Sequence, residues 1–364
     1  MWKKYINTLM YDVTMNCNLR CIHCYNNDFL DVGQPIEIDV QEIMAGLQKI
    51  KFTNIVIQGG EPLLVQNLEN LVEGINNEGI NVFITTNATL LTKERVISLI
   101  KAGIKGIYFS IESASQKIND KMRGTGTYVS FYNNVMNFMK IYSMLLNKKY
   151  IHPMRIELSC TASSINLGSD NEIRKIFNLA EELKIETIRF NFLQNFGASK
   201  KLIYNEHLTN LEIANMIAHV SKEFPCICVQ LPMKHIEHEF LKKTHGLNLN
   251  IEGAKGRCPA GESIAYVDAD LNIYPCSWLI HLNKEDAFTL ENKISLYGRV
   301  PENIFDSFIA YKDKCILMFE DCKECIYKNN CIPKCPCLER FESKSGNLKT
   351  VDCPTRKEIG EYIK

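Results

Sequence analysis

One unit repeats through the first 200 residues: a short β-rich apolar run, a turn, and an amphipathic helical pattern. The apolar runs predict six strands, over residues 9–14, 54–58, 81–86, 106–111, 155–161 and 187–192. The stretches between them predict helices over residues 39–50, 67–77, 92–102, 128–146 and 171–183. Strands that alternate with helices pair in parallel through right-handed crossovers. Six units are too few for a closed eight-stranded barrel, so we expect an α/β fold built as a partial (β/α)6 barrel, with functional residues at the carboxyl ends of its strands.

The pattern changes after the sixth strand. From residue 196 to residue 253 the alternation lapses, and only residues 207–222 and 234–245 are predicted to be helical. Beyond Cys258 the chain becomes short strands, turns and cysteines, with a hairpin predicted at 266–267 and 272–274. Such a segment has little apolar core, so bound metal would have to stabilise it. We therefore expect a barrel over 1–195, a bridging segment over 196–253 and a small cysteine-rich iron–sulfur domain over 254–364.

The charges and the apolar runs exclude several function classes. The 364 residues carry 42 basic and 42 acidic side chains, so no basic field exists to attract nucleic acid. No apolar run approaches the roughly 18 residues that a membrane-spanning helix needs. The first residues alternate and break too early to form a signal peptide. We therefore expect a cytoplasmic protein that binds neither nucleic acid nor membrane.

The cysteines are numerous for such a protein. There are 15 of them, and a reducing compartment would keep them from forming a disulfide framework. Seven lie between Cys315 and Cys353 at short spacings, which indicates metal or iron–sulfur ligation. Scattered cysteines such as Cys160, Cys226 and Cys228 are more typical of small buried apolar residues.

A first group of cysteines follows the first predicted strand, in the segment C17-NLR-C21-IH-C24. Three thiolates on one tight loop can bind three irons of a cubane and leave the fourth iron open to another ligand. Zinc would need a fourth protein ligand, which the nearby His23 could supply. From the spacing alone, both readings stand.

This group, followed by the aromatic Tyr25, resembles the cluster motif of the radical S-adenosylmethionine (SAM) superfamily. The resemblance implies that the open iron chelates the amino and carboxylate groups of SAM. An electron from the cluster would then cleave SAM to methionine and a 5′-deoxyadenosyl radical, which abstracts hydrogen from the substrate. Together with the motifs below, the resemblance covers residues 8–193 and 258–353.

Further motifs follow the later strands in the order that the resemblance requires. G59-G60-E61-P62 is similar to the family's GGEP motif, in which the glycines would admit the methionine moiety and Glu61 would accept a hydrogen bond from its amino group. Arg123 matches an arginine that pairs with the SAM carboxylate, although a surface charge at a helix end is the simpler alternative. Leu193 would contact adenine through its backbone, or be an ordinary core leucine. The full set of SAM-binding residues that the resemblance implies is Tyr25, Gly59, Gly60, Glu61, Pro62, Thr86, Asn87, Ser110, Arg123 and Leu193.

The chain departs from the family pattern at several of these motifs. After the third strand, Ala88 stands where a glycine is common. After the fourth strand, Glu112 and Ser113 replace the Asp and Gly of the family's SxDG segment.

A second group of cysteines, C322-KE-C325-IYKNN-C331-IPK-C335, resembles the SPASM extension of peptide-modifying radical SAM enzymes. The resemblance implies two auxiliary 4Fe–4S clusters, which makes three 4Fe–4S clusters with SAM as a further cofactor. The outer auxiliary cluster would use Cys322, Cys325, Cys331 and Cys353, and the inner one Cys258, Cys276 and Cys335.

The second group also departs from its family pattern. Leu271 occupies a position that is usually glycine, and the residues after Cys258 supply no fourth ligand for the inner cluster. The inner cluster would therefore keep an open iron, or use Cys315 or Cys337 as its fourth ligand. For both cysteines a buried apolar role is the alternative.

The resemblance favours a maturase that acts on a ribosomally made peptide by cross-linking, epimerisation or oxidation. A small-molecule radical SAM dehydrogenase is the alternative, and a non-enzymatic iron–sulfur electron-transfer or assembly protein is disfavoured by the GGEP motif and by Ser110 and Arg123. Formylglycine formation is disfavoured as well, because Ser277 and Trp278 follow Cys276 where those enzymes place an Asp.

Three further expectations concern partners and hydrogen return. An external electron donor such as flavodoxin or ferredoxin would reduce the clusters. A peptide substrate would be held by the barrel mouth, by the bridging segment 196–253 or by a separate leader-binding partner, because the first strand begins almost at once. If the enzyme epimerises a residue, Cys160, Cys226 and Cys228 are candidate thiol hydrogen donors, with buried apolar roles as the alternative.

Overall fold

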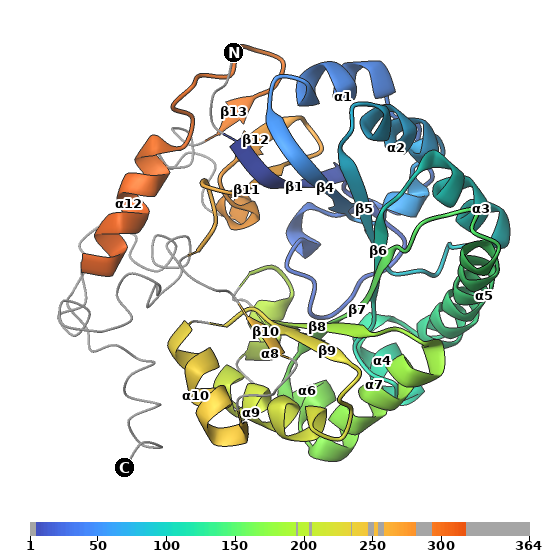
Figure 1. The fold of residues 1–364 in the computed structure, drawn as a ribbon. Helices are drawn as coiled ribbons and strands as arrows, with labels where there is room; N and C mark the ends of the chain where they lie inside the picture. The colour runs from blue at the N-terminus through green and yellow to red at the C-terminus, as the bar shows by residue number, and fades with distance from the viewer. Residues whose placement is uncertain are drawn as a thin grey trace.

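The computed structural model describes residues 5–193, 196–203, 206–233, 235–246, 251–253, 258–281 and 293–317. Within them, eleven strands form one sheet in the order β10-β9-β8-β7-β6-β5-β4-β1-β11-β12-β13. Neighbours are parallel from β10 to β11 and antiparallel from β11 to β13. The sheet curls into an open barrel with helices along its outer side (Figure 1). The predicted α/β class and the partial barrel are confirmed.

The six predicted strands are all present, in the predicted order. They are β1 (Tyr5–Thr14), β4 (Lys51–Gly59), β5 (Asn81–Thr86), β6 (Gly106–Ser110), β7 (Arg155–Ala162) and β8 (Thr187–Phe192). The five predicted helices are also present, as α1 (Val40–Leu47), α2 (Leu68–Asn77), α3 (Lys93–Ala102), α5 (Thr127–Asn147) and α7 (Asp170–Leu183).

Shorter elements fill the connections between them. After β1 and β4 these are β2 (Asn16–Cys17), η1 (Asn27–Phe29), β3 (Asp31–Val32) and η2 (Pro62–Leu64). After β6 and β7 they are α4 (Gln116–Arg123) and α6 (Ser164–Leu167).

Local chemistry explains where the helices begin and end. The Thr92 side chain accepts a hydrogen bond from the Arg95 backbone at the start of α3, and Gly103 ends that helix with a φ of 97°. The Ser169 hydroxyl caps α7 in the same way, by accepting from Glu172. The apolar faces of these helices bury against the outer side of the sheet, where Leu99 and Phe177 belong to one continuous core.

The bridging segment 196–253 differs from the expectation. Its helices are α8 (Ser199–Ile203), α9 (Asn210–Ser221) and α10 (His235–His245), and its strands are β9 (Cys228–Leu231) and β10 (Ile251–Gly253). The alternation of strands and helices therefore continues, and both strands extend the parallel sheet. The sequence did not reveal them because runs of three and four residues are too short to show a period.

The C-terminal part joins the sheet on the other side of β1. The predicted hairpin is confirmed as β11 (Ile264–Val267) and β12 (Asn272–Tyr274), followed by η3 (Ser277–His281), β13 (Ile294–Ser295) and α12 (Asp306–Leu317). Strand β1 pairs with β4 on one edge and with β11 on the other, so the first strand lies inside the sheet.

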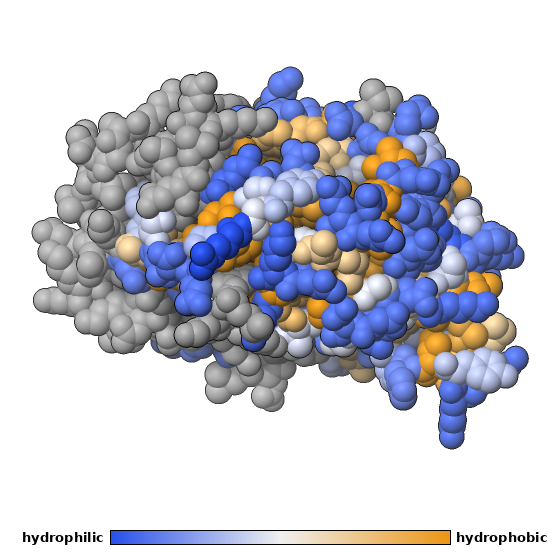
Figure 2. Space-filling view, turned by 90° about the horizontal axis from the view of Figure 1, so that it is seen from above, coloured by the Kyte–Doolittle hydropathy of each residue, from blue (hydrophilic) through white to orange (hydrophobic). Residues whose placement is uncertain are grey.

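The surface is mixed in character. Figure 2 shows a face covered largely by hydrophilic side chains, with small apolar patches between them. Among the described residues, no helix is both long enough and apolar enough to span a membrane.

Candidate functional site

The three cysteines of the first group lie on one loop at the carboxyl end of β1. The loop begins with β2, which ends at Cys17 and pairs in parallel with β3. Cys21 and Cys24 follow before η1. In Figure 1 this segment runs within the curve of the sheet, where parallel barrels place their functional residues. We call residues 16–29 the cysteine loop.

The GGEP segment holds the beginning of the cysteine loop. The Gly60 and Glu61 amides donate to the carbonyl oxygens of Thr14 and Asn16 at 2.7 and 2.8 Å. A Cβ on Gly60 would lie 2.1 Å from the Asn16 carbonyl oxygen, and Gly59 has a φ of 131°. Both glycines are therefore required by the close approach of two backbones, in addition to any ligand they admit.

Two other segments hold the middle of the cysteine loop. The Ile22 amide donates to the carbonyl oxygen of Met122 in α4 at 2.9 Å. After β8, the Ala198 amide donates to the Cys24 carbonyl oxygen at 3.0 Å. The preceding Gly197 has a φ of 54°, and a Cβ there would lie 2.3 Å from the Tyr25 carbonyl oxygen. This close contact requires a glycine at position 197.

Glu61 is buried and joins the GGEP segment to the end of β5. Its Oε1 accepts from the Thr86 hydroxyl at 2.6 Å and from the Leu63 amide at 3.1 Å, and its Oε2 accepts from the Asn87 amide at 2.8 Å. A carboxylate has about four acceptor positions, so one on Oε2 is left for a ligand. The Asn87 side chain in turn donates to Asn18 of the cysteine loop at 2.9 Å.

Glu112 brings together two groups that the sequence did not connect. Its Oε1 lies 3.0 Å from Nε2 of His23 and 3.1 Å from Nε of Arg123, and its Oε2 accepts from the Thr161 amide at 2.6 Å. Burial alone would raise the pKa of Glu112, but His23 and Arg123 outweigh it and lower the pKa to about 2. Arg123 is therefore a buried, paired residue at the end of α4, and a surface charge is excluded.

Cys17 is buried, and Cys21 and Cys24 are partly buried. Burial raises the pKa of Cys17 to about 11 and that of Cys24 to about 12, while the Arg123 charge works in the opposite direction at Cys21 and Cys24. Such thiols become thiolates when a metal binds them. Three sulfur donors on one loop fit the three protein-bound irons of a 4Fe–4S cluster.

The zinc reading fits less well. Among the described residues, no group of three or more His, Cys, Asp and Glu side chains gathers as ligands of one metal ion. His23 directs its Nε2 to Glu112, and its Nδ1 is buried with no hydrogen-bond partner. Glu112 therefore competes with any metal ion for Nε2 of His23.

The other predicted SAM-binding residues surround the same edge of the sheet. Ser110 ends β6, directly before the segment that leads to Glu112. Leu193 follows β8 and is buried. The Tyr25 ring makes an edge contact with His281 of η3, at 5.8 Å between ring centroids. His281 also stacks on Phe196 at 4.8 Å, so aromatic rings connect the cysteine loop to the segment after Cys276.

Of the candidate thiol hydrogen donors, Cys160 lies beside Glu112, whereas Cys226 and Cys228 lie at the start of β9. Cys160 is fully buried in β7, where its Sγ lies 3.5 Å from the Glu112 carbonyl oxygen and 3.4 Å from Nδ2 of Asn166. Cys226 is exposed before β9, and Cys228 begins that strand, at the amino edge of the sheet. We assign none of the three a role in hydrogen return.

Two of the predicted auxiliary-cluster ligands are described. Cys258 and Cys276 both pack against a small apolar cluster that contains Tyr266 and Phe308. The fully buried Lys312 of α12 donates to the carbonyl oxygens of Cys258 and Ala260 at 2.9 and 3.1 Å and pairs with Glu262. Cys322, Cys325, Cys331, Cys335, Cys337 and Cys353 lie outside the described residues, as does the side chain of Cys315.

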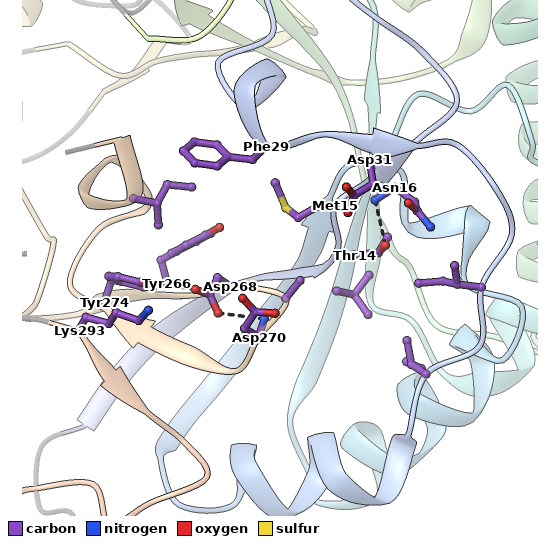
Figure 3. Close-up of a pocket in the computed structure, with 15 residues that line it drawn as sticks. Thr14, Met15, Asn16, Phe29, Asp31, Tyr266, Asp268, Asp270, Tyr274 and Lys293 are labelled. Carbon is purple, nitrogen blue, oxygen red and sulfur yellow. Dashed lines mark hydrogen bonds between the residues drawn. The ribbon is translucent and has the colours of Figure 1, made fainter. Parts of the chain in front are cut away.

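A cavity of about 630 Å³ opens beside the residues that lead into Cys17. Met15 and Phe29 line one side, and the turn of the β11–β12 hairpin, with Asp268 and Asp270, lines the other (Figure 3). The Asp268 carboxylate is engaged within the hairpin by Asn272 and Tyr274. This volume is in the usual range for a small-molecule or side-chain pocket.

Part of this chain is similar to known proteins. Residues 11–150 match the family model described as the radical SAM superfamily. AdoMet-dependent heme synthase from Methanosarcina barkeri is 24% identical over 287 residues, which are 74% of this chain and 76% of that protein. Fe-coproporphyrin III synthase from the same organism is 27% identical over 55% of this chain, and the match spans 47% of that relative's length.

Three solved structures of two proteins share the fold. Streptococcus suis SuiB bound to S-adenosylmethionine superposes with a TM-score of 0.70 at 15% identity, over 96% of this chain and 78% of SuiB. SuiB bound to the precursor peptide SuiA superposes with a TM-score of 0.65 at 14% identity, over 96% of this chain and 75% of SuiB. Native anSMEcpe with bound AdoMet and Cp18Cys peptide superposes with a TM-score of 0.59 at 16% identity, over 98% of this chain and 96% of that one.

Proposed function

We propose that Cys17, Cys21 and Cys24 bind a 4Fe–4S cluster and that the chain cleaves S-adenosylmethionine reductively, because residues 11–150 match the radical SAM superfamily model. The family implies both groups, and when bound they supply the abstraction of a hydrogen atom from a substrate. The observation that carries the proposal is the cysteine loop itself. The loop that carries its three thiols is held from one side by the GGEP segment and from the other by α4.

The chain's own residues bind and orient SAM in this proposal. Arg123 holds the carboxylate of SAM, because its guanidinium lies near Cys21 and, among the described residues, is hydrogen-bonded through Nε. Glu61 accepts from the amino group of SAM through the acceptor position left on Oε2. Each charge-assisted hydrogen bond would contribute roughly 1.5–3 kcal/mol to SAM binding.

We assign the substrate to a ribosomally made peptide that is cross-linked, epimerised or oxidised. The fold likeness to SuiB over nearly the whole chain supports this assignment, since SuiB binds a precursor peptide. anSMEcpe, which also shares the fold, binds the Cp18Cys peptide. The cavity beside residues 14–16 has room for a side chain of such a peptide. An external electron donor such as flavodoxin or ferredoxin and a separate leader-binding protein complete the proposal.

A small-molecule substrate is the second candidate. The two curated relatives are named for the synthesis of heme and of Fe-coproporphyrin III, and the first of them matches 74% of this chain. Iron coproporphyrin is therefore the small-molecule probe that the comparison favours.

The experiment tests both candidates with the anaerobically reconstituted enzyme, SAM and dithionite. We expect 5′-deoxyadenosine to form, and a short peptide encoded beside the gene to change mass. The Cys17→Ala, Cys21→Ala and Cys24→Ala triple variant should form no 5′-deoxyadenosine, whereas Cys226→Ala, an exposed cysteine at the opposite edge, should behave like the parent. Consumption of iron coproporphyrin with unchanged peptides would favour the second candidate. Product from the triple variant would refute the assignment of the loop.

We also propose two auxiliary clusters in the C-terminal part, with Cys258 and Cys276 among the ligands of the inner one. Their packing against one small apolar cluster supports this. Three clusters of four irons each predict about twelve irons per chain after reconstitution. Iron and sulfide analysis checks the number. A value near four would leave only the cluster of the cysteine loop.

A further inference from the structure

Glu112 is the residue through which three segments of the site meet. One of its oxygens, Oε1, is shared by His23 of the cysteine loop and Arg123 of α4, at 3.0 and 3.1 Å. The other oxygen accepts from the Thr161 amide of β7 at 2.6 Å. The side chain is 1% exposed, so both contacts form away from water, where electrostatic interactions are strongest.

The backbone of Glu112 is fixed as firmly as its side chain. Its amide donates to Oδ1 of Asn119 in α4 at 3.1 Å, and its carbonyl oxygen accepts from Nδ2 of Asn166 in α6 at 2.6 Å. The carboxylate therefore has little freedom to follow Arg123 or His23 if they move. It is a fixed point to which both side chains are held.

The way in which Arg123 is bound matters for its role. Glu112 engages Nε, which leaves the two terminal nitrogens of the guanidinium with their donors for another partner. The neighbouring Met122 carbonyl oxygen accepts from Ile22, next to His23. Glu112 and Met122 thus fix the same short stretch of the cysteine loop relative to the end of α4.

We propose that Glu112 is a positioning residue, which presents the terminal nitrogens of Arg123 to the carboxylate of SAM and holds the His23 stretch of the cysteine loop. The inference rests on the proposed contact between Arg123 and SAM. In this role Glu112 acts through Arg123 and His23. Its negative charge keeps the buried guanidinium oriented before SAM arrives, so the ligand does not have to order it.

The test measures SAM binding by calorimetry in the reconstituted holoenzyme. Glu112→Gln keeps the shape and removes the charge, and should weaken SAM binding about tenfold. Glu112→Asp keeps the charge and should lose less than threefold. In the Arg123→Ala background, which is itself weakened by one to two powers of ten, Glu112→Gln should have no further effect beyond twofold.

A matched control is available on the neighbouring strand. Glu157 of β7 is also fully buried and is also paired with two arginines, Arg155 and Arg189, but it lies toward the amino edge. Glu157→Gln should therefore leave SAM affinity unchanged, while it lowers stability about as much as Glu112→Gln does. Iron content and melting temperature, measured on every variant, show that each is folded and loaded.

The outcomes separate the two levels of the proposal. If Arg123→Ala binds SAM as tightly as the parent, the contact assigned to Arg123 is wrong. If that variant is weakened and Glu112→Gln is not, only the positioning role of Glu112 is overturned. Equal losses for Glu112→Asp and Glu112→Gln, or equal losses for Glu112→Gln with and without Arg123, would overturn it as well.

Discussion

At the scale of single residues, two buried carboxyl groups behave in opposite ways. Glu112 has cationic neighbours and its pKa is low. Asp12 of β1 is just as buried, but its partners are the hydroxyl of Tyr266 and the amides of Gln58 and Asn26. Burial raises the pKa of Asp12 to about 6, and these neutral hydrogen bonds offset it only partly. Asp12 thus connects β1, β4, β11 and the cysteine loop, and its contribution to the free energy of unfolding depends on pH.

The first prediction follows from that pKa. Between about pH 4 and pH 6 the folded state binds more protons at Asp12 than the unfolded state, so the free energy of unfolding falls as pH rises through this range. Asp12→Asn removes this dependence. From pH 5 to pH 7.5 the unfolding free energy of the variant should therefore rise by about 1 kcal/mol relative to that of the parent protein. Denaturant titrations at both pH values measure it, and a difference that does not change with pH would contradict the raised pKa.

At the scale of elements, the cysteine loop has no regular structure of its own over most of its length and is held by its neighbours. The GGEP segment, the end of α4 and the turn after β8 each contribute backbone hydrogen bonds. Like the GGEP segment, the turn after β8 requires glycine, because Gly197 has a left-handed φ and an added Cβ would clash with the Tyr25 carbonyl oxygen. The order of the loop therefore depends on segments up to about 180 residues away in sequence.

The second prediction compares two glycines. Gly79 has a φ of 78° and nothing within 4 Å of an added Cβ, so Gly79→Ala should cost about 1 kcal/mol through its backbone conformation alone. Gly197→Ala adds a clash with the Tyr25 carbonyl oxygen and should cost a further 1–3 kcal/mol.

The readouts for this pair are melting temperature and the iron retained after desalting. Gly197→Ala should lose iron from the cysteine loop, and Gly79→Ala should retain the parent amount. Equal stability and equal iron in the two variants would show that the turn after β8 does not hold the loop.

At the scale of the whole molecule, the sequence predicted the six barrel strands, the cysteine loop and the order of the motifs, because each depends on local pattern. It could not predict the meeting of His23, Glu112 and Arg123, since no local pattern reports a contact across the barrel. Nor could it show that Ala88 and Leu271, which replace family glycines, keep φ values of 60° and 56°. Leu271 is 2% exposed, so the burial of its side chain offsets the strained backbone.

The last prediction concerns the division of the chain into parts. Because β11 pairs with β1 inside one continuous sheet, the C-terminal hairpin should unfold together with the barrel and not before it. Ala265 is buried in β11 opposite Leu9, and a proline there removes a backbone donor from the interior of the sheet. Ala265→Pro should therefore lower the melting temperature strongly and expose β1 and β4 to hydrogen exchange.

The control is Ser295→Pro, in the outermost strand β13, which should leave the hydrogen exchange of β1 and β4 unchanged. If Ala265→Pro instead unfolds only the segment after residue 258 and leaves β1 and β4 protected, the two parts are independent folding units and the shared sheet does not couple them.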